Sequence, residues 1–367
     1  MVLSAINLLA ITLALFSVPR NMPPLAAKDD VADREKQHII STSDYGARKN
    51  HPTSYDNSPS FKGPLQLTQK ESPDFYRKRI RGYYLDNEKL CNTLHEQLPT
   101  TLTLGPSTPT GTILKSIVDH LARSDAPVDV KEVAESTEFY LRSGKRLIGA
   151  ARRVLQNNAA KCKNSNGNSK TSKIKNTITI QDLCSGHGLT GLLFLACNPP
   201  GRFSDTRIRA VLVDQFEPKS HAILRDCISE ICPWVAESVS FYSSGLEKFA
   251  SQQRKDEDGS CDDSDSTNVQ NNDATIIIST HACGSLTDMV LEYAMDVESA
   301  SVAVMPCCYT GTDSGVPYGV RRMLGVGLSA DVRRSFTLQD RGYLVDFAAV
   351  PRAITPMNRI VVAERRK

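Results

Sequence analysis

One stretch of the sequence constrains the fold more than any other, the glycine-rich segment from Ile178 to Gly191, which reads ITIQDLCSGHGLTG. Its first residues are apolar and β-branched, which is typical of a buried strand. Gly186, Gly188 and Gly191 follow, and an apolar run then begins a helix. A glycine turn between a strand and a helix lets the backbone come close to a bulky ligand. The segment therefore predicts the first strand, loop and helix of a nucleotide-binding fold.

Beyond this segment, candidate strands alternate with helical stretches, which predicts a parallel sheet with helices on both faces. A short connection containing proline joins the last two candidate strands and predicts an antiparallel hairpin. The expected fold class is therefore α/β and Rossmann-like, with a mostly parallel sheet that ends in an antiparallel hairpin and is preceded by a helical segment. The candidate strands are Thr177–Leu183, Ile208–Val213, Val239–Tyr242, Thr275–Ser279, Val302–Met305, Leu344–Val350 and Ile360–Glu364.

The chain divides into four predicted regions by composition and periodicity. Residues 1–22 hold a possible targeting segment, and residues 23–72 are polar and predict a linker or disordered arm. Residues 73–156 predict a helical segment, followed by an Asn/Ser/Lys-rich connector over Asn157–Asn176. Residues 174–367 form the expected α/β domain.

Three helices are expected within the helical segment, because apolar residues recur there at helical spacing. The first covers Asp74–Leu98, the second begins with Thr110 or a neighbour as its cap, and the third covers Val130–Leu155. We expect a break in the third helix near Gly144, since glycine weakens a helix interior.

The N-terminal apolar run, Val2 to Val18, is short for a membrane span. Its length suits a signal-peptide core, and its end resembles the cleavage region of bipartite plastid targeting signals. We therefore expect organellar, plastid-type targeting and no transmembrane span in the mature protein. The alternative is a buried helix in a cytoplasmic protein. The adjacent Cys307 and Cys308, in a chain with no C-x-x-C pair, suit a reduced compartment.

The net charge of +3 hides an acidic insertion, residues 251–273, which holds seven acidic and two basic residues. The remaining chain therefore carries +8, a surplus compatible with RNA as partner and equally with scattered surface charge. We expect the insertion to be disordered. Basic residues at helical spacing predict either an RNA path or solvated helix faces, and these are Lys145, Arg146, Arg152, Arg153, Arg321, Arg322, Arg333 and Arg334.

Two carboxylates frame the predicted nucleotide site. Asp214 ends the second strand, where a carboxylate can accept hydrogen bonds from both ribose hydroxyls, and Asp182 ends the first strand. The spacing of Gly186, Gly188 and Gly191 also matches the dinucleotide fingerprint, so an NAD-dependent oxidoreductase is the first rival. Asp182 counts against an NAD-dependent oxidoreductase, and so does the C-terminal hairpin, which ends the fold soon after the fifth strand. A catalytically idle module that binds a cofactor or nucleotide is the other alternative.

Two further motifs follow the fourth and fifth strands, over Thr280–Asp288 and Met305–Gly311. Ligands of open parallel sheets bind beyond the carboxyl ends of the strands. Five candidate residues should therefore lie along one rim. Ser285 and Asp288 match the capping box that starts a helix. The rim candidates are Cys184, His281, Cys283, Cys307 and Cys308.

The combination of DLCSGHG, HACGSLTD and PCC resembles a branch of methyltransferase-domain proteins, and the terminal hairpin is typical of class I methyltransferases. Eukaryotic methyltransferase-like proteins, bacterial relatives and, more distantly, tRNA 2′-O-ribose methyltransferases belong there. The resemblance implies S-adenosylmethionine as cofactor, direct transfer of its methyl group, and no particular acceptor, so that RNA is one possibility. The cofactor residues that it implies are Asp182, Cys184, Ser185, Gly186, Gly188, Asp214, Gln215, Ser244 and His281.

The sequence departs from the class I pattern at two places. Cys184 stands where most methyltransferases have the first glycine of the loop. The segment Ser243–Glu247 lacks the aspartate that often contacts the adenine amino group, and Ser244 is the candidate to replace it. No Asn-Pro-Pro-Tyr motif follows the fourth strand, which disfavours methylation of adenine or glutamine nitrogen.

Three roles are open for the rim thiols. A zinc site needs four converging ligands, and the spacing here is not that of a zinc motif, so we expect no metal. A nucleophilic cysteine needs a lowered thiol pKa. We favour the third role, in which Cys307 and Cys308 line the pocket and pack, with His281 as the polar candidate. These three residues are the candidates for catalysis.

Overall fold

The computed structural model describes residues 108–124, 126–165, 175–203, 205–258, 271–306, 308–309, 315–351, 354–355 and 357–366. All of them belong to one compact unit, Ser54–Lys367. The predicted targeting segment, the linker, the helix predicted over Asp74–Leu98 and the side chain of Cys307 lie outside the described residues.

A seven-stranded sheet forms the centre of the described unit, in the order β3-β2-β1-β4-β5-β7-β6. Neighbouring strands from β3 to β5 are parallel, whereas β7 pairs antiparallel with both β5 and β6. This arrangement confirms the predicted fold class, including the terminal hairpin. The strands are β1 Lys175–Leu183, β2 Thr206–Asp214, β3 Val239–Ser243, β4 Asn271–Ser279, β5 Ser301–Val304, β6 Tyr343–Ala349 and β7 Arg359–Arg365.

The central strands form because their residues are apolar on both faces. Ile276, Ile277 and Ile278 of β4 are consecutive and fully buried, as expected of a parallel sheet covered on both sides. The edge strand β6 differs, since Leu344 is half exposed. Strand order turns back at β1, which has β2 on one side and β4 on the other. Ligand sites of such sheets lie at this switch point.

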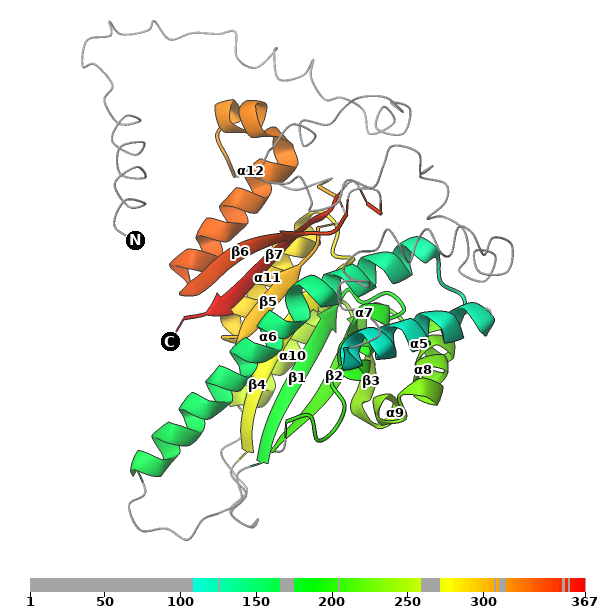
Figure 1. Cartoon of the computed structure of the whole chain (residues 1–367). Helices are drawn as coiled ribbons and strands as arrows, with labels where there is room; N and C mark the ends of the chain where they lie inside the picture. The colour runs from blue at the N-terminus through cyan, green and yellow to red at the C-terminus, as the bar shows by residue number, and fades with distance from the viewer. Residues whose placement is uncertain are drawn as a thin grey trace, which may run out of the picture. The chain divides into compact units, whose positions relative to one another are not determined.

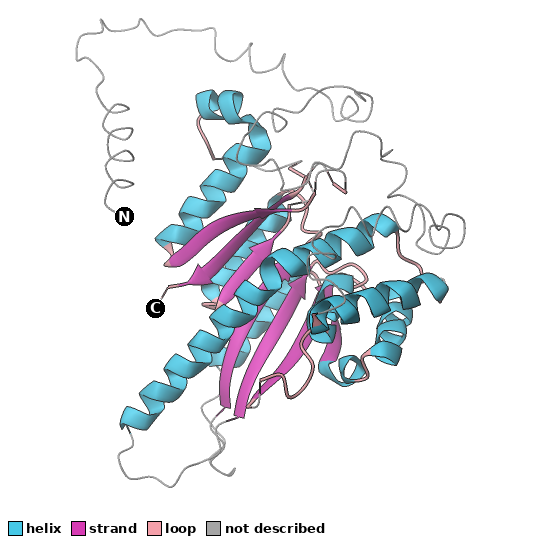
Figure 2. Ribbon diagram, in the orientation of Figure 1, coloured by secondary structure: helices cyan, strands magenta, loops and turns pink. Residues whose placement is uncertain are grey.

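Helices cover both faces of the sheet (Figures 1 and 2). One buried cluster joins the sheet to α5–α9, and a second joins it to α10–α12. None of the helices in the described residues is long and apolar enough to cross a membrane. The helices are α5 Pro109–Arg123, α6 Val130–Ser165, α7 Leu189–Ala196, α8 Lys219–Ile231, α9 Trp234–Ser238, α10 Leu246–Asp258, α11 Ser285–Asp296 and α12 Tyr318–Asp340.

Helix α6 is longer than the sequence indicated. It runs unbroken through Gly144 and continues into the predicted connector as far as Ser165. Gly144 serves close packing, because a Cβ there would lie 2.6 Å from the ring of Tyr140. That ring packs edge-on against Phe194 of α7, with centroids 4.9 Å apart. The predicted break was therefore wrong: the glycine makes room for an aromatic ring one turn earlier.

The acidic insertion is flanked by regular structure on both sides. Helix α10 extends into it as far as Asp258, and β4 begins at Asn271, earlier than predicted. Backbone pairing with β1 accounts for the early start, because Asn271–Asp273 continue the register opposite Lys175–Thr177. Residues 259–270 lie outside the described part of the chain.

Candidate functional site

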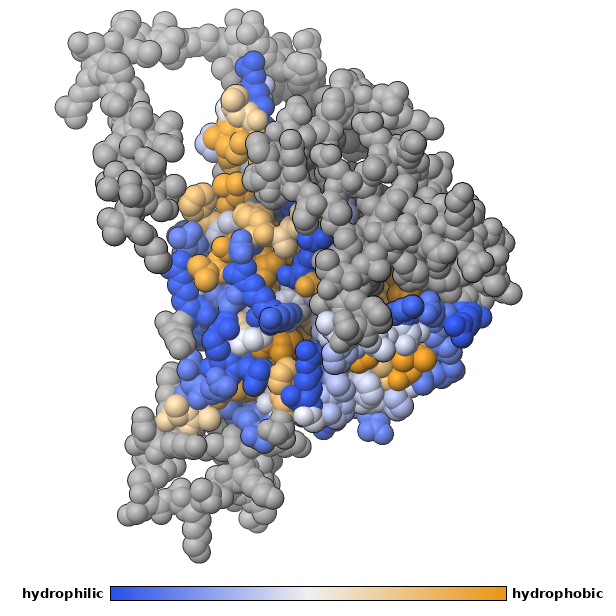
Figure 3. All heavy atoms as spheres, in the orientation of Figure 1, coloured by the Kyte–Doolittle hydropathy of each residue, from blue (hydrophilic) through white to orange (hydrophobic). Residues whose placement is uncertain are grey.

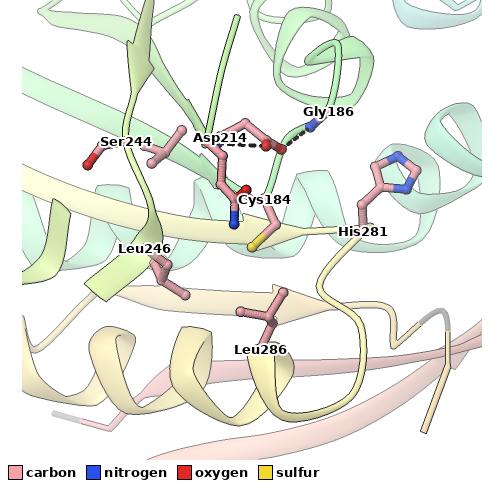
Figure 4. A pocket seen from close by; sticks show the side chains of 9 residues that line it. Cys184, Gly186, Asp214, Ser244, Leu246, His281 and Leu286 are labelled. Carbon is pink, nitrogen blue, oxygen red and sulfur yellow. Dashed lines mark hydrogen bonds between the residues drawn. The ribbon is translucent and has the colours of Figure 1, made fainter. Parts of the chain in front are cut away.

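A cavity of about 220 Å³ opens at the carboxyl edge of the sheet, at the switch point (Figure 4). Six of the nine predicted cofactor residues line it. The three other lining residues are apolar and were not predicted as site residues. The lining consists of Cys184, Gly186, Val213, Asp214, Gln215, Ser244, Leu246, His281 and Leu286.

Asp214 is held in place by the glycine loop. Its Oδ2 accepts a hydrogen bond of 2.7 Å from the Gly186 N–H, and its Oδ1 accepts one of 2.7 Å from the Gln215 N–H (Figure 4). Its carbonyl oxygen accepts a hydrogen bond from the Ser244 N–H at 2.7 Å, which ties the ends of β2 and β3 together. A carboxylate has about four lone-pair sites, so two remain for a ligand in the cavity. The cavity thus contains a fixed, charged acceptor.

The glycines of the loop are needed for two different reasons. Gly188 caps α7 with a φ of 80°, and a Cβ there would lie 2.4 Å from the side chain of Leu212. Gly186 has a φ of 56°, and a Cβ there would point into open space, with His281 as its nearest neighbour at 4.0 Å. Gly188 therefore permits packing, whereas Gly186 keeps the cavity wide.

Asp182 does not line the cavity; it lies beneath the loop and is 1% exposed. Its Oδ2 accepts a hydrogen bond of 2.9 Å from the Gly191 N–H, and its Oδ1 accepts none from any described residue. Burial raises the pKa of Asp182 to about 7, and the charge of Asp214 adds to the rise. Ser185 is likewise buried, and no described residue bonds its hydroxyl. The structure thus places Asp182 and Ser185 behind the wall.

Cys184 is the one lining residue with a strained backbone, at a φ of 56°. This left-handed conformation favours glycine, the residue that most methyltransferases have here. Burial raises the pKa of the thiol to about 12, and the charges of Asp214 and Asp182 contribute. Cys184 is therefore a neutral wall residue.

His281 forms the polar wall opposite the Ser244 end of the cavity (Figure 4). Burial lowers its pKa, and the neighbouring His187 lowers it further. The imidazole is therefore neutral at neutral pH and can accept a proton. His187, inside the glycine loop, has its Nε2 4.0 Å from Glu132 Oε2 on α6. Sequence reasoning missed this histidine because it was treated only as a spacer between two glycines.

The two rim motifs lie side by side. The Gly284 N–H donates to the carbonyl of Cys308 at 3.3 Å, and Cys308 is a half-buried free thiol. Cys283, the rim candidate next to Gly284 in the sequence, is exposed and disulfide-bonded. Cys307 lies outside the described side chains. In the described part of the chain, no group of three His, Cys, Asp or Glu residues could hold a metal ion.

Asp288 does not close the capping box that the sequence suggested. Helix α11 begins after Gly284 without a side-chain cap. The Asp288 carboxylate instead accepts two hydrogen bonds of 2.9 Å from the Arg334 guanidinium of α12. Arg334 also donates to the carbonyl of Gly284 at 3.2 Å and to Asp331 Oδ1 at 3.1 Å. The capping prediction failed because the Asp288 carboxylate binds the buried Arg334, which is distant in sequence.

The same ion pairs extend to the second rim motif. Asp331 Oδ2 accepts from the Tyr309 hydroxyl at 2.6 Å and from Arg359 Nε at 2.7 Å. Arg359 Nη2 also donates to the Tyr309 hydroxyl at 2.9 Å. We call Asp288, Tyr309, Asp331, Arg334 and Arg359 the arginine–aspartate network. It joins α11, α12 and β7 to the loop after β5.

Four of the eight basic residues considered for an RNA path, Arg146, Arg153, Arg333 and Arg334, form ion pairs with other described residues. Arg334 is almost fully buried in the network. Arg146 pairs with Asp346 and Glu364, and Arg153 also pairs with Glu364. The eight residues therefore do not form one continuous path.

A family model described as a methyltransferase domain matches residues 227–314. This range runs from α8 through β5 into the following loop, so it includes both rim motifs and leaves out the glycine loop. No curated protein sequence matches the chain.

Three solved structures are similar at low identity. The fibrillarin pre-rRNA processing protein of Methanococcus jannaschii is 10% identical, covers 54% of this chain and 70% of that chain, and has a TM-score of 0.28. A fibrillarin/Nop5p complex is 8% identical, covers 55% of this chain and 77% of that chain, and has a TM-score of 0.28. A Listeria monocytogenes protein described as a class I S-adenosylmethionine-dependent methyltransferase is 12% identical, covers 80% of this chain and 84% of that chain, and has a TM-score of 0.36. Likenesses this distant carry no argument here.

The family match and the topology agree. Residues 227–314 include both motifs whose loops meet at the rim. The sheet has the antiparallel β7 between β5 and β6 that distinguishes it from the all-parallel dinucleotide-binding order. Residues 227–314 therefore match a methyltransferase-domain model, and they lie in a mixed sheet whose strand β7 runs antiparallel between β5 and β6.

Proposed function

We propose that this domain binds S-adenosylmethionine in the cavity beside Asp214 and transfers its methyl group to a nucleophile. The observation that carries the proposal is the Asp214 carboxylate, which two backbone N–H groups fix at the switch point. Two vicinal ribose hydroxyls fit such an acceptor, because each can donate one hydrogen bond to it.

The rest of the cavity suits a nucleoside with a positively charged substituent. Leu246 and Leu286 provide apolar surface for a purine ring (Figure 4). Gly186 leaves the space that a Cβ would occupy. The Asp214 carboxylate favours a cation nearby.

The residues of the chain act mainly by positioning. When bound, the cofactor supplies an electrophilic methyl group. Asp214 and the glycine loop would hold the nucleoside and so position the cofactor for an acceptor that enters at the rim. His281, neutral and at the cavity wall, can take a proton from an acceptor that must lose one. We favour a role for His281 in holding the cofactor, and Cys308 and Cys307 remain rim candidates without an assigned step.

RNA is the acceptor class that we favour. The positive surplus outside the acidic insertion supports an anionic acceptor, since such a surface attracts a phosphate backbone. The proposal rests on charge and not on a recognised base or sequence.

Transfer of a labelled methyl group from S-adenosylmethionine into a total lysate, separated into RNA, protein and small molecules, tests the activity. We expect label in the RNA fraction with the wild-type protein and none with Asp214→Ala. Asp226→Ala, an exposed carboxylate on α8, is the matched control and should behave as wild type. Cofactor binding without label in any fraction would indicate an idle cofactor-binding module.

His281→Ala separates two roles in the same assay. Loss of cofactor affinity, which we expect, assigns the imidazole to the cofactor cavity. Retained affinity with lost transfer would assign it to proton transfer instead.

A further inference from the structure

The first part of α12 is exposed and differs from the rest of that helix. A break at Gly325, with a φ of 75° and a ψ of 162°, separates it from the part that packs on the sheet. We call residues Tyr318–Leu324 the outer segment. Tyr318 is 72% exposed and Met323 is 80% exposed, which is unusual for large apolar side chains in a folded domain.

The outer segment belongs to the helix that packs against β6, at the side of the sheet away from β3. Figure 1 shows α12 continuing past the carboxyl ends of the strands, and Figure 3 shows apolar atoms gathered on this part of the helix. The glycine at the break is required for this course, because other residues rarely adopt its backbone angles.

Two arginines make the outer segment cationic. Arg321 and Arg322 are exposed, and neither forms an ion pair with a described residue. No acidic residue occurs between Gly315 and Ala330. Beyond the break, by contrast, Arg333 and Arg334 pair with Asp288. The cationic surface is therefore confined to the part of α12 that protrudes.

Helical spacing sorts the exposed side chains into two faces. Tyr318 and Arg322 are four residues apart and share one face, and Arg321 flanks them. Val320 and Met323 point to the other side. One face thus presents an aromatic ring between two guanidinium groups. This combination matches a single-stranded nucleic acid, because bases stack on aromatic rings and phosphates pair with arginine.

We propose that the face formed by Tyr318, Arg321 and Arg322 binds single-stranded RNA beyond the carboxyl ends of the strands. The inference rests on the proposed function, since it names where the acceptor is held. RNA is favoured because the aromatic ring lies on the same face as the two cations, where a base can stack on it while the arginines contact phosphates. The apolar Val320 and Met323 on the other face are the side chains that a membrane would contact.

Fluorescence anisotropy of the full-length protein with a labelled single-stranded RNA of mixed sequence, about twelve nucleotides long, tests the proposal. Arg321→Gln combined with Arg322→Gln should weaken binding at least tenfold. Loss of two phosphate contacts should also make the slope of log affinity against log salt shallower by about 1.4. Tyr318→Ala should weaken binding at least fivefold.

A control with the same change of charge is Arg207→Gln combined with Arg225→Gln. Arg207 lies near the amino end of β2, at the opposite edge of the sheet, and Arg225 lies on α8. This variant should bind the RNA within twofold of wild type. Equal weakening by both double variants would overturn the proposal, as would a wild-type protein that does not bind the RNA.

Two further measurements separate the other outcomes. Vesicles containing anionic phospholipid should not bind; vesicle binding that Val320→Ser with Met323→Ser abolishes, without RNA binding, would assign the segment to a membrane and overturn the proposal. Affinity for S-adenosylmethionine should be unchanged in every variant. A wild-type protein that binds RNA through this face but no S-adenosylmethionine would defeat the proposed function and leave the RNA surface standing.

Discussion

At the scale of single residues, Asp182 combines two features that are costly in a fold. Its side chain is fully buried, and one carboxylate oxygen accepts no hydrogen bond from any described residue. Burial disfavours the charged form of a carboxylate, which explains why the pKa of Asp182 rises to about 7. The hydrogen bond from Gly191 offsets only part of this cost.

The pH dependence of stability tests the environment of Asp182. Its pKa in the folded state exceeds the value of about 3.9 in an unfolded chain, so folding binds a proton between these values. Its contribution therefore favours folding at acid pH and is lost as the pH rises from about 4 through about 7. The difference corresponds to a few kcal/mol, on the order of 4. The lowered pKa values of His187 and His281 act in the opposite direction over this range, so the fall is measured as a difference. Between pH 5 and pH 8, the wild type should lose stability relative to Asp182→Asn in urea unfolding.

Exposed carboxylates do not produce this effect, so Asp226→Asn should keep the wild-type pH profile. A profile for Asp182→Asn that superimposes on the wild type would contradict the assignment of the raised pKa to Asp182.

Cys184 allows a second test at this scale. Its positive φ costs about 1 kcal/mol, which glycine would recover, while the loss of its side-chain contacts offsets the gain. The free energy of unfolding of Cys184→Gly should therefore lie within about 1 kcal/mol of the wild-type value. Cys184→Val introduces a β-branched residue at the same angles and should destabilise by about 1–3 kcal/mol. Urea denaturation compares the two, and a valine variant as stable as the glycine variant would refute the strain.

At the scale of elements, the arginine–aspartate network fixes the two loops of the rim. Asp331 is fully buried and contacts both Arg334 and Arg359. Through Gly284 and Tyr309, the network reaches the loop after β4 and the loop after β5. The network therefore ties the two rim motifs to α12 and β7.

Removal of the central carboxylate should be severe. Asp331→Asn leaves two buried guanidinium groups with an incomplete set of partners, which costs about 3–5 kcal/mol. Asp340→Asn, at the exposed end of the same helix, should change the free energy of unfolding by less than about 0.5 kcal/mol. Calorimetric or urea unfolding of the two variants measures the difference. A loss below about 1 kcal/mol for Asp331→Asn would show that the pairs are solvated in solution.

At the scale of the whole molecule, the fold was predictable because strand-forming runs, such as the buried isoleucines of β4, alternate with helical stretches and end at glycine, proline or polar loops. Six of the predicted cofactor residues line one cavity because each follows a strand end, and parallel strands end at the same edge. Leu246 and Leu286 were missed, since an apolar residue in the first turn of a helix looks like any core residue. The burial of Arg334 was not predictable, because its partner Asp288 lies 46 residues away.

The affinity of the purified protein for S-adenosylmethionine, measured by calorimetry, tests the central claim most directly. The account predicts binding of S-adenosylmethionine and no binding of NAD. Asp214→Ala should weaken the binding at least tenfold in a folded protein, because hydrogen bonds to a charged acceptor are worth about 1.5–3 kcal/mol each. Binding of NAD without S-adenosylmethionine, or an unchanged dissociation constant in folded Asp214→Ala, would contradict it.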